Sequence, residues 1–169
     1  MKIEKGILDA LNAQIHREYY SAYLYLSMSY YCYENGLPGF GNWLNLQKME
    51  DCVHAEMLAK HILERSGRVQ LATIEAPPRQ WENVQELFEA VLEHERLMTM
   101  SIQDLATLAS AQKDFAVQSL LKRFIDAQVE EESMVENILH QMRYAQIDTP
   151  SIFLLDRELA QRTQFDMKG

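Results

Sequence analysis

Cysteine, glycine, proline and long apolar runs are scarce in this sequence, and each scarcity excludes a class of protein. Two cysteines, Cys32 and Cys52, are too few for a disulfide framework, and neither belongs to a CxxC pair of the kind that binds zinc. We therefore expect a reducing, cytoplasmic location with both cysteines as small core residues. No apolar run reaches 18 residues, and acidic residues interrupt the N-terminal segment, so we expect neither a membrane span nor a signal peptide.

Positive charge is also in short supply. The chain has 25 acidic residues against 16 Lys and Arg residues, which gives a formal net charge of -9. This balance disfavours a surface that follows nucleic-acid phosphates and makes cations the better candidates for ligands. We therefore expect no nucleic-acid partner.

The residues that are abundant favour helix. Hydrophobic residues make up 47% of the chain, and only six Gly and four Pro interrupt its 169 residues. A chain of this length can bury one sizeable core. We expect a single all-α domain over residues 1–169.

Four long stretches place apolar residues at steps of three and four, which predicts four amphipathic helices. Their approximate limits are Lys5 to Tyr33, Asn42 to Ser66, Asn83 to Ser110 and Asp114 to Ala145, so that a bundle occupies about 5–145.

Residues at the ends of these stretches are suited to capping. Gly67 is a C-cap candidate for the second helix, and Asn83 with Glu86 is compatible with a capping arrangement at the start of the third. Thr149 as a cap and Pro150 at the first helical position predict a short fifth helix over about 149–163.

The lengths of the links decide the topology. The first and third links are only a few residues long, so each joins antiparallel neighbours. The middle link, residues 68–82, extends to roughly 50 Å at about 3.3 Å per residue, whereas a 25-residue helix is about 37 Å long. This link can therefore run the whole length of the bundle and leave the second and third helices parallel. Two hairpins joined by one long crossover is the predicted fold.

Each of the four apolar stripes is interrupted at mid-length by a charged or metal-binding side chain. The interruptions are Glu18 in the first, Asp51 and His54 in the second, Glu95 in the third, and Gln128 and Glu131 in the fourth. Gln47, one turn before Asp51, is a further polar residue in the second stripe, without an assigned role.

The spacing of these residues places them at one height in the bundle. Glu18 and His54 are equidistant from Gly36 in the first turn, and Glu95 and Glu131 are equidistant from Lys113 in the second. The two hairpins therefore repeat the same interval, and their interruptions face each other across the core.

Such an arrangement suits two metal ions. Residues three apart share one face of a helix, so Asp51 with His54, and Gln128 with Glu131, can each hold one metal. Glu18 and Glu95 complete the pattern of carboxylate-bridged di-iron bundles. Carboxylates with an imidazole suit Fe(II) and Fe(III), and four carboxylates balance two Fe(II) ions.

A structural role is the alternative for each of these residues alone. Each could be a buried polar group satisfied by its neighbours, or it could face solvent on a rotated stripe. Six such residues at matching heights favour a metal site over that alternative.

These residues resemble those of the bacterial non-haem ferritins over almost the whole chain. The matching motifs are Glu18, Tyr25, Asp51-x-x-His54-Ala55, His94-Glu95 and Gln128-x-x-Glu131. The resemblance implies a ferritin-like four-helix bundle with a ferroxidase centre. It assigns the first iron to Glu18, Asp51, His54 and Gln128, and the second to Glu95 and Glu131, with Glu18 as the bridge.

This sequence departs from the family pattern at three positions. Asp51 stands where the family normally has Glu, and its shorter side chain leaves the occupancy of the first iron site open. Many members bind a third iron; Glu50, Glu130 and Glu131 match that site, but Ala127 replaces a further acid and leaves the third ion open. Cys52 stands where the related bacterioferritins carry a haem-binding Met, so we expect no haem.

The tyrosines and two remaining histidines have separate expected roles. Tyr25 lies two turns after Glu18 on the same face, where it can donate an electron, hydrogen-bond a ligand, or simply pack in the core. Six further tyrosines crowd the first helix, more than one core face can absorb, and we expect an intersubunit interface there. His61 and His140 are expected at the surface or an interface.

The resemblance implies an iron-storage subunit with ferroxidase activity. Fe(II) would be oxidised by O2 or H2O2 at the dinuclear centre and stored as mineral inside a hollow shell of 24 identical subunits. One alternative is a di-iron peroxidase or oxidase of the rubrerythrin kind, without iron storage and usually with a cysteine cluster that is absent here. A second alternative is a helical interaction module without enzymatic activity.

Overall fold

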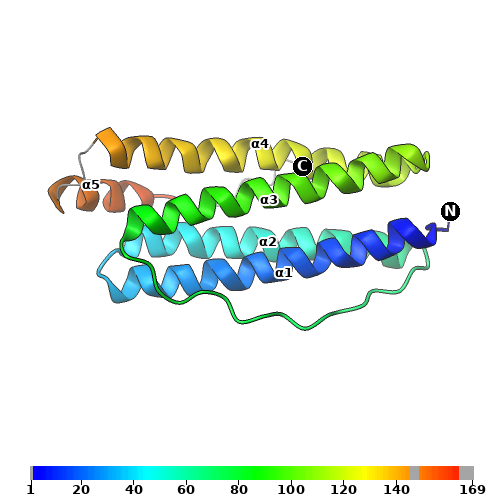
Figure 1. Ribbon diagram of the computed structural model, residues 1–169, viewed down its shortest axis with the longest axis horizontal. Coiled ribbons are helices and arrows are strands. Elements are labelled where there is room, and N and C mark those ends of the chain that lie inside the picture. Colours follow the sequence, from blue (N-terminus) through cyan, green and yellow to red (C-terminus); the bar gives the residue numbers. More distant parts are fainter. Residues whose placement is uncertain (1, 145–148, 164–169) are drawn as a thin grey trace.

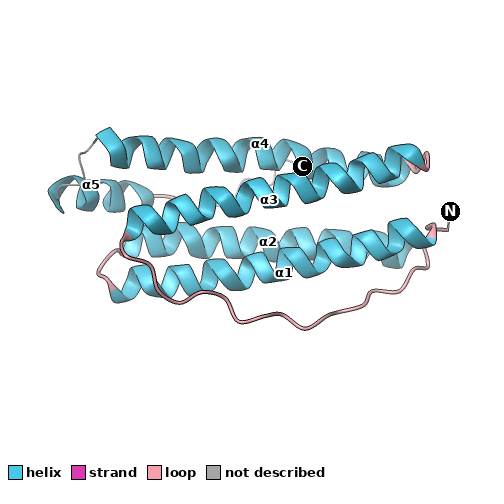
Figure 2. Ribbon diagram, viewed as in Figure 1, coloured by secondary structure: helices cyan, strands magenta, loops and turns pink. Residues whose placement is uncertain are grey.

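The computed structural model describes residues 2–144 and 149–163, and these ranges contain five α-helices and no strand (Figures 1 and 2). Four long helices lie side by side as a bundle, and the short fifth helix packs at one end of it. Their bounds are α1 Lys5–Glu34, α2 Pro38–Glu64, α3 Val84–Ala111, α4 Phe115–Tyr144 and α5 Thr149–Leu159. The predicted bundle with a short fifth helix is confirmed. The predicted end of the fourth helix at Ala145 lies outside the described residues.

Two tight turns close the hairpins α1–α2 and α3–α4. Gly36 in the first turn has φ +74°, and Lys113 in the second has φ +55°, so both adopt the left-handed conformation that ends a helix. These are the two residues about which the sequence spacing is symmetric. At the start of α3 the predicted cap is confirmed, because the Asn83 side chain accepts a hydrogen bond of 2.9 Å from the amide of Glu86.

Three predicted helix ends were wrong, and one of them is the end of α5, which stops at Leu159 and not at about residue 163. α2 begins at Pro38, four residues before the expected Asn42, because Pro38 occupies the first helical position, where a missing N–H does no harm. Gly39 is a packing residue: a Cβ there would lie 1.7 Å from the backbone oxygen of Asp156 in α5. At the other end of α2 the left-handed residue is Ser66, with φ +56°, and not the expected Gly67.

The long link between α2 and α3 runs the length of the bundle beside α1 (Figure 1). Near one end, the Asn12 side chain donates to the Arg68 carbonyl at 3.1 Å and accepts from the Gln70 amide at 2.7 Å. Near the other, the Tyr31 hydroxyl donates to the Trp81 carbonyl at 3.0 Å. The crossover therefore leaves α2 and α3 parallel, as predicted.

The core consists of two apolar clusters rather than one. One cluster gathers around Met28, Phe40 and Phe88, and the other around Leu11, Leu58 and Leu121. The residues that interrupt the apolar stripes come from the sequence positions between these clusters on all four long helices. A polar layer thus divides the core across the middle of the bundle. None of the helices in the described ranges has both the length and the apolar content that a membrane span requires.

An ion pair joins the end of α2 to the start of α4. Arg65 donates from Nη1 to Oδ1 of Asp114 at 3.0 Å and from Nη2 to Oδ2 at 2.8 Å, and both side chains are nearly buried. Asp114 also caps α4 by accepting from the Val117 amide at 3.1 Å. Burial alone would raise the pKa of Asp114, but the hydrogen bonds from Arg65 and Val117 outweigh it and lower that pKa.

Replacing Asp114 by Ala should lower the free energy of unfolding by about 3 kcal/mol, because it removes a helix cap and leaves Arg65 without this partner. Because the pKa of Asp114 is lowered, its contribution is present above about pH 4 and is lost as the pH falls further. Denaturant unfolding at pH 7 and pH 3 measures both effects. The exposed Asp104→Ala is the control; an equal loss in both variants would contradict the assignment.

Candidate metal centre

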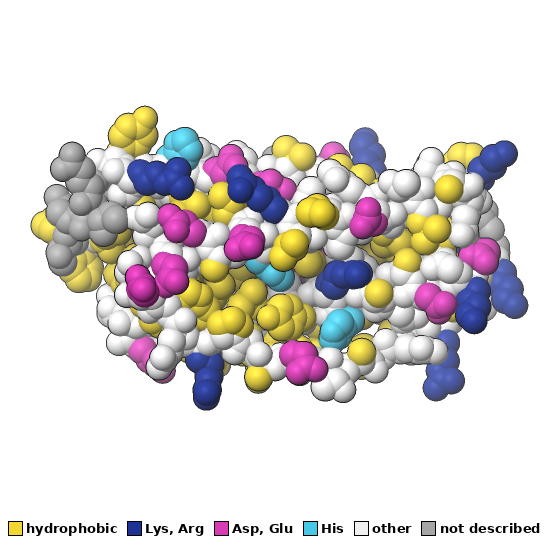
Figure 3. Space-filling view, viewed as in Figure 1, with side chains coloured by type: hydrophobic (Ala, Val, Ile, Leu, Met, Phe, Trp, Pro, Cys, Tyr) yellow, Lys and Arg dark blue, Asp and Glu magenta, His cyan; other side chains and the backbone are white. Residues whose placement is uncertain are grey.

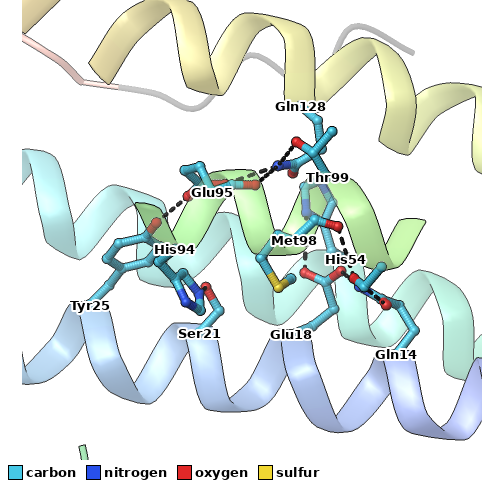
Figure 4. A network of polar contacts seen from close by, with 11 residues as sticks. Gln14, Glu18, Ser21, Tyr25, His54, His94, Glu95, Met98, Thr99 and Gln128 are labelled. Carbon is cyan, nitrogen blue, oxygen red and sulfur yellow. Dashed lines mark hydrogen bonds and ion pairs between the residues drawn. The ribbon is translucent and has the colours of Figure 1, made fainter. Parts of the chain in front are cut away.

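Side chains from all four long helices converge in the polar layer, and Figure 4 shows part of this network. Each of the six residues predicted from the stripes is buried, with no more than 6% of its surface exposed. They are Glu18 from α1, Asp51 and His54 from α2, Glu95 from α3, and Gln128 and Glu131 from α4. All six therefore lie in the interior, as their spacing in the sequence predicts.

Glu18, Asp51 and His54 form the first of two compact groups. One ligand atom from each lies within 4.8 Å of the other two, so a single ion can reach all three. His54 Nδ1 is 3.7 Å from Glu18 Oε2, and the Gln14 amide donates to the other Glu18 oxygen at 2.9 Å. The shorter side chain of Asp51 still reaches this group.

Glu50, His54 and Glu131 form the second group by the same distance criterion. His54 therefore belongs to both groups, and as a neutral imidazole it has one free nitrogen and can hold one ion at a time. Glu50 is only 8% exposed, although the stripe pattern did not place it in the core. Burial raises the pKa of Glu50, and the charge of Glu130, the other acid expected near a third ion, raises it further although Glu130 is exposed.

Glu95 belongs to a separate hydrogen-bonded chain in the same layer (Figure 4). The Tyr25 hydroxyl donates to Glu95 Oε1. The Gln128 amide donates to Glu95 Oε2 at 3.0 Å and to its backbone oxygen at 3.2 Å. Gln128 is thus hydrogen-bonded to Glu95.

The electrostatics of the layer favour neutral acids or bound cations. Burial raises the pKa of Asp51 well above its ordinary value, and the charges of Glu18 and Glu95 raise it further. Burial and the neighbouring carboxylates raise the pKa of Glu131 in the same way. Burial also raises the pKa of Glu95, although the hydrogen bonds of Tyr25 and Gln128 act in the opposite direction.

The two histidines of the layer differ. Burial acts to lower the pKa of His54, but the hydrogen bond and charge of Glu18 outweigh it, so that this pKa is raised. Burial lowers the pKa of His94 to about 4, which keeps its ring neutral at physiological pH. His94 is 2.8 Å from the Ser21 hydroxyl through Nε2, which fixes its ring beside Tyr25.

The donor set fits a divalent transition metal. Asp51 Oδ2 and Glu131 Oε1 are buried, and neither has a hydrogen-bond partner among the described residues. Gln47, also fully buried, lacks partners in that part of the chain for both its amide oxygen and its amide nitrogen. Unpaired carboxylate oxygens beside an imidazole nitrogen are ligands of the kind that iron takes up in both oxidation states.

Several supporting residues were not found from the sequence. Gln14 orients Glu18, Ser21 contacts His94, and Thr99 accepts a hydrogen bond of 3.2 Å from Gln128. They lie beside the apolar stripes, and small polar residues at such positions are common on any helix, so no signal singles them out. Cys32 is buried as expected, but Cys52 is half-buried and does not belong to the core.

A groove of about 600 Å³ lies between α1 and α3, and apolar side chains gather between these helices on the same face of the molecule (Figure 3). Gln14 and Ser101 line it, and the Ser101 hydroxyl donates to the Gln14 side-chain oxygen at 2.9 Å. Because Gln14 also donates to Glu18, it connects the groove with the first group.

Comparison with known proteins agrees with this geometry. Residues 8–145 match the model of the ferritin-like domain. A bacterial non-heme ferritin of Bacteroides fragilis is 37% identical over 160 residues, covering 95% of this chain and 99% of that protein. One of Staphylococcus aureus is 32% identical over 161 residues, covering 95% and 97%.

Solved structures of ferritins are also similar to this chain. An open-pore ferritin of Archaeoglobus fulgidus superposes with a TM-score of 0.93 at 40% identity, covering 95% of this chain and 98% of that one. A closed form of the same ferritin, engineered by mutagenesis, has a TM-score of 0.94 at 40% identity and covers 97% and 100%. The chain therefore belongs to the ferritin family.

Proposed function

We propose that this iron-storage ferritin subunit is a ferroxidase, which oxidises Fe(II) at a dinuclear centre in the polar layer and passes Fe(III) to a mineral store. The observation that carries the proposal is the convergence of buried acids and His54, with carboxylate oxygens left unpaired, in a chain of the ferritin family. Iron is the substrate here, and O2 or H2O2 is the oxidant. Each ferrous ion gives up one electron, and the oxidant accepts two.

The two ions occupy positions between the helices that the ligand groups define. Glu18, Asp51 and His54, which lie close enough to share one ion, hold the first. The resemblance to the family assigns the second to Glu131 and Glu95, with Glu18 as the bridge. In the metal-free layer these acids repel one another and have lost their hydration, at a cost of several kcal/mol each unless they take up protons. Binding of ferrous ions removes that repulsion and releases those protons.

Tyr25 and Gln128 control the position of Glu95. Both donate to its carboxylate, one to each oxygen, so Glu95 is held in one orientation until an ion competes for it. The Tyr25 hydroxyl is fully buried, and burial raises its pKa well above the ordinary value. It therefore remains a protonated donor, placed to supply a proton or an electron as the oxidant is reduced.

The mineral store requires a closed shell, and the first helix offers a surface for assembly. Tyr23, Tyr30 and Tyr33 expose 48%, 58% and 48% of their surfaces. Exposed tyrosines combine large apolar contact area with a polar tip and are enriched at protein interfaces. We propose a homo-oligomer, a shell of 24 subunits in the cytoplasm, with these residues in a subunit interface.

A peroxidase or oxidase of the rubrerythrin kind remains the second candidate. The same di-iron layer would serve that reaction, so only assembly and storage separate the two. The sequence identity of 37% to a bacterial non-heme ferritin over nearly the whole chain favours the storage protein.

Replacing Asp51 by Asn should raise the thermal midpoint of the metal-free protein by about 2–4 °C, because the amide avoids the cost of burying or protonating a carboxylate in the acidic cluster. The same variant should lose the stabilisation that added Co²⁺ gives to the wild type. Calorimetry with and without Co²⁺ measures both. The exposed Glu93→Gln is the control, and a metal-free Asp51→Asn protein less stable than wild type would contradict the proposed repulsion.

Aerobic addition of Fe(II) to the metal-free protein should give a fast rise of ferric absorbance near the ultraviolet. Glu18→Ala and Glu131→Ala should slow this phase at least about tenfold, because each removes a ligand of the layer. Stopped-flow absorbance measures the rates, with Glu93→Gln as the matched charge control. Equal rates in all four proteins would reject the ferroxidase assignment.

The native particle should be many times larger than the subunit of 19.7 kDa. Tyr30→Glu should shift it toward smaller species, because a buried interface does not tolerate an unpaired charge. Light scattering after gel filtration gives the masses, and Glu93→Gln is again the control. A wild-type dimer would favour the rubrerythrin-like alternative.

A further inference from the structure

The chain returns to the polar layer after α5, through Arg162. The Asn42 side chain donates to the Arg162 carbonyl at 3.0 Å, which fixes this segment against the start of α2. The guanidinium lies 5.0 Å from the centre of the Trp43 ring, and its Nη2 is 3.5 Å from Glu50 Oε2. The Arg162 side chain is only 16% exposed, so this is a nearly buried cation at the edge of the candidate metal centre.

The buried carboxylates of the layer carry more negative charge than two ferrous ions neutralise. Five carboxylates are buried there, and two ferrous ions neutralise four of them. The five acids are Glu18, Glu50, Asp51, Glu95 and Glu131. Arg162 supplies the remaining positive charge, so the layer is neutral when it holds two ferrous ions.

We propose that Arg162 is a positioning and selectivity residue. Its guanidinium pairs with Glu50 as a cation supplied by the protein, and this pairing limits the number of tightly bound metal ions to two. This inference rests on the proposed function and concerns the same centre. A third ion between Glu50 and Glu131 competes with the guanidinium for the Glu50 carboxylate.

The contact between Arg162 and Glu50 is weak enough for a metal ion to replace the guanidinium as the partner of Glu50. Glu50 Oε2 and Arg162 Nη1 are both buried, and neither has a hydrogen-bond partner among the described residues. The two groups are therefore held by charge without a directed hydrogen bond, and a divalent ion offers Glu50 a stronger partner. Because the backbone of Arg162 is held by Asn42, the guanidinium can move away and return while its segment stays in place.

Anaerobic Co²⁺ titration of the assembled protein tests the proposal, with metal analysis to count the ions per subunit. Arg162→Met removes the charge but keeps an apolar side chain over Trp43. It should bind a third Co²⁺ about tenfold more tightly than wild type, the effect of one neighbouring charge removed, and this gain should exceed any gain for the first two ions. Arg162→Lys should behave as wild type, and so should Arg157→Gln, which removes an exposed charge from α5.

A double-mutant comparison separates this role from simple anchoring of the segment. If Arg162 acts through Glu50, the gain in Arg162→Met must disappear in Glu50→Gln, because the third ion then lacks its ligand. A third ion bound equally in wild type and Arg162→Met would overturn the proposal, and so would a gain that persists in Glu50→Gln. If Arg162→Met does not assemble, Arg162→Gln replaces it in the titration. A third ion bound more tightly in Arg162→Lys than in wild type would also overturn the proposal.

A failure of the proposed function would give a different result in the same titration. If wild type and Glu18→Ala bind the same number of ions with the same affinities, the dinuclear centre itself is rejected and the role of Arg162 falls with it. If wild type holds two ions that Glu18→Ala loses, the centre stands, and the third ion alone decides the role of Arg162.

Discussion

Burial of five carboxylates in one layer between two apolar clusters is the constraint on which the rest of this structure depends. An unneutralised charge in such surroundings costs several kcal/mol, and neighbouring like charges add to that cost. The layer is therefore stable only with protons, with cations, or with both. The donors on Glu95 hold a carboxylate in place, and the guanidinium beside Glu50 supplies positive charge.

The two hairpin turns determine whether the ligands of the paired helices reach this layer. A left-handed residue in each turn, Gly36 and Lys113, sets how the paired helices align. One added or deleted residue in either turn would rotate a helix by about 100° relative to its partner, because α-helices have 3.6 residues per turn. Ligands from that helix would then leave the layer, so the turns and the centre are specified together.

Much of this was predictable from the sequence because the signals are local or periodic. The apolar stripes gave the helices, and the equal intervals about Gly36 and Lys113 placed Glu18, His54 and their counterparts in one layer. Contacts between distant segments carry no such period. The local spacing of residues indicates neither the contact of Arg162 with Glu50 nor the close approach of α5 that leaves no room for a Cβ at Gly39. Gly67 is not the left-handed residue, but a Cβ there would lie 2.7 Å from the Ile62 side chain, a packing requirement that propensity does not record.

The crossover beside α1 has a consequence for how the chain can be cut. Its two ends are bonded to α1 through Asn12 and Tyr31, whereas residues 71–76 between them are exposed. Opening the backbone there would divide the chain into two fragments without breaking either end contact. The apolar clusters and the polar layer would then have to form between the fragments, each of which contributes half of the ligands. Cations that bind the layer would therefore strengthen the association of the halves.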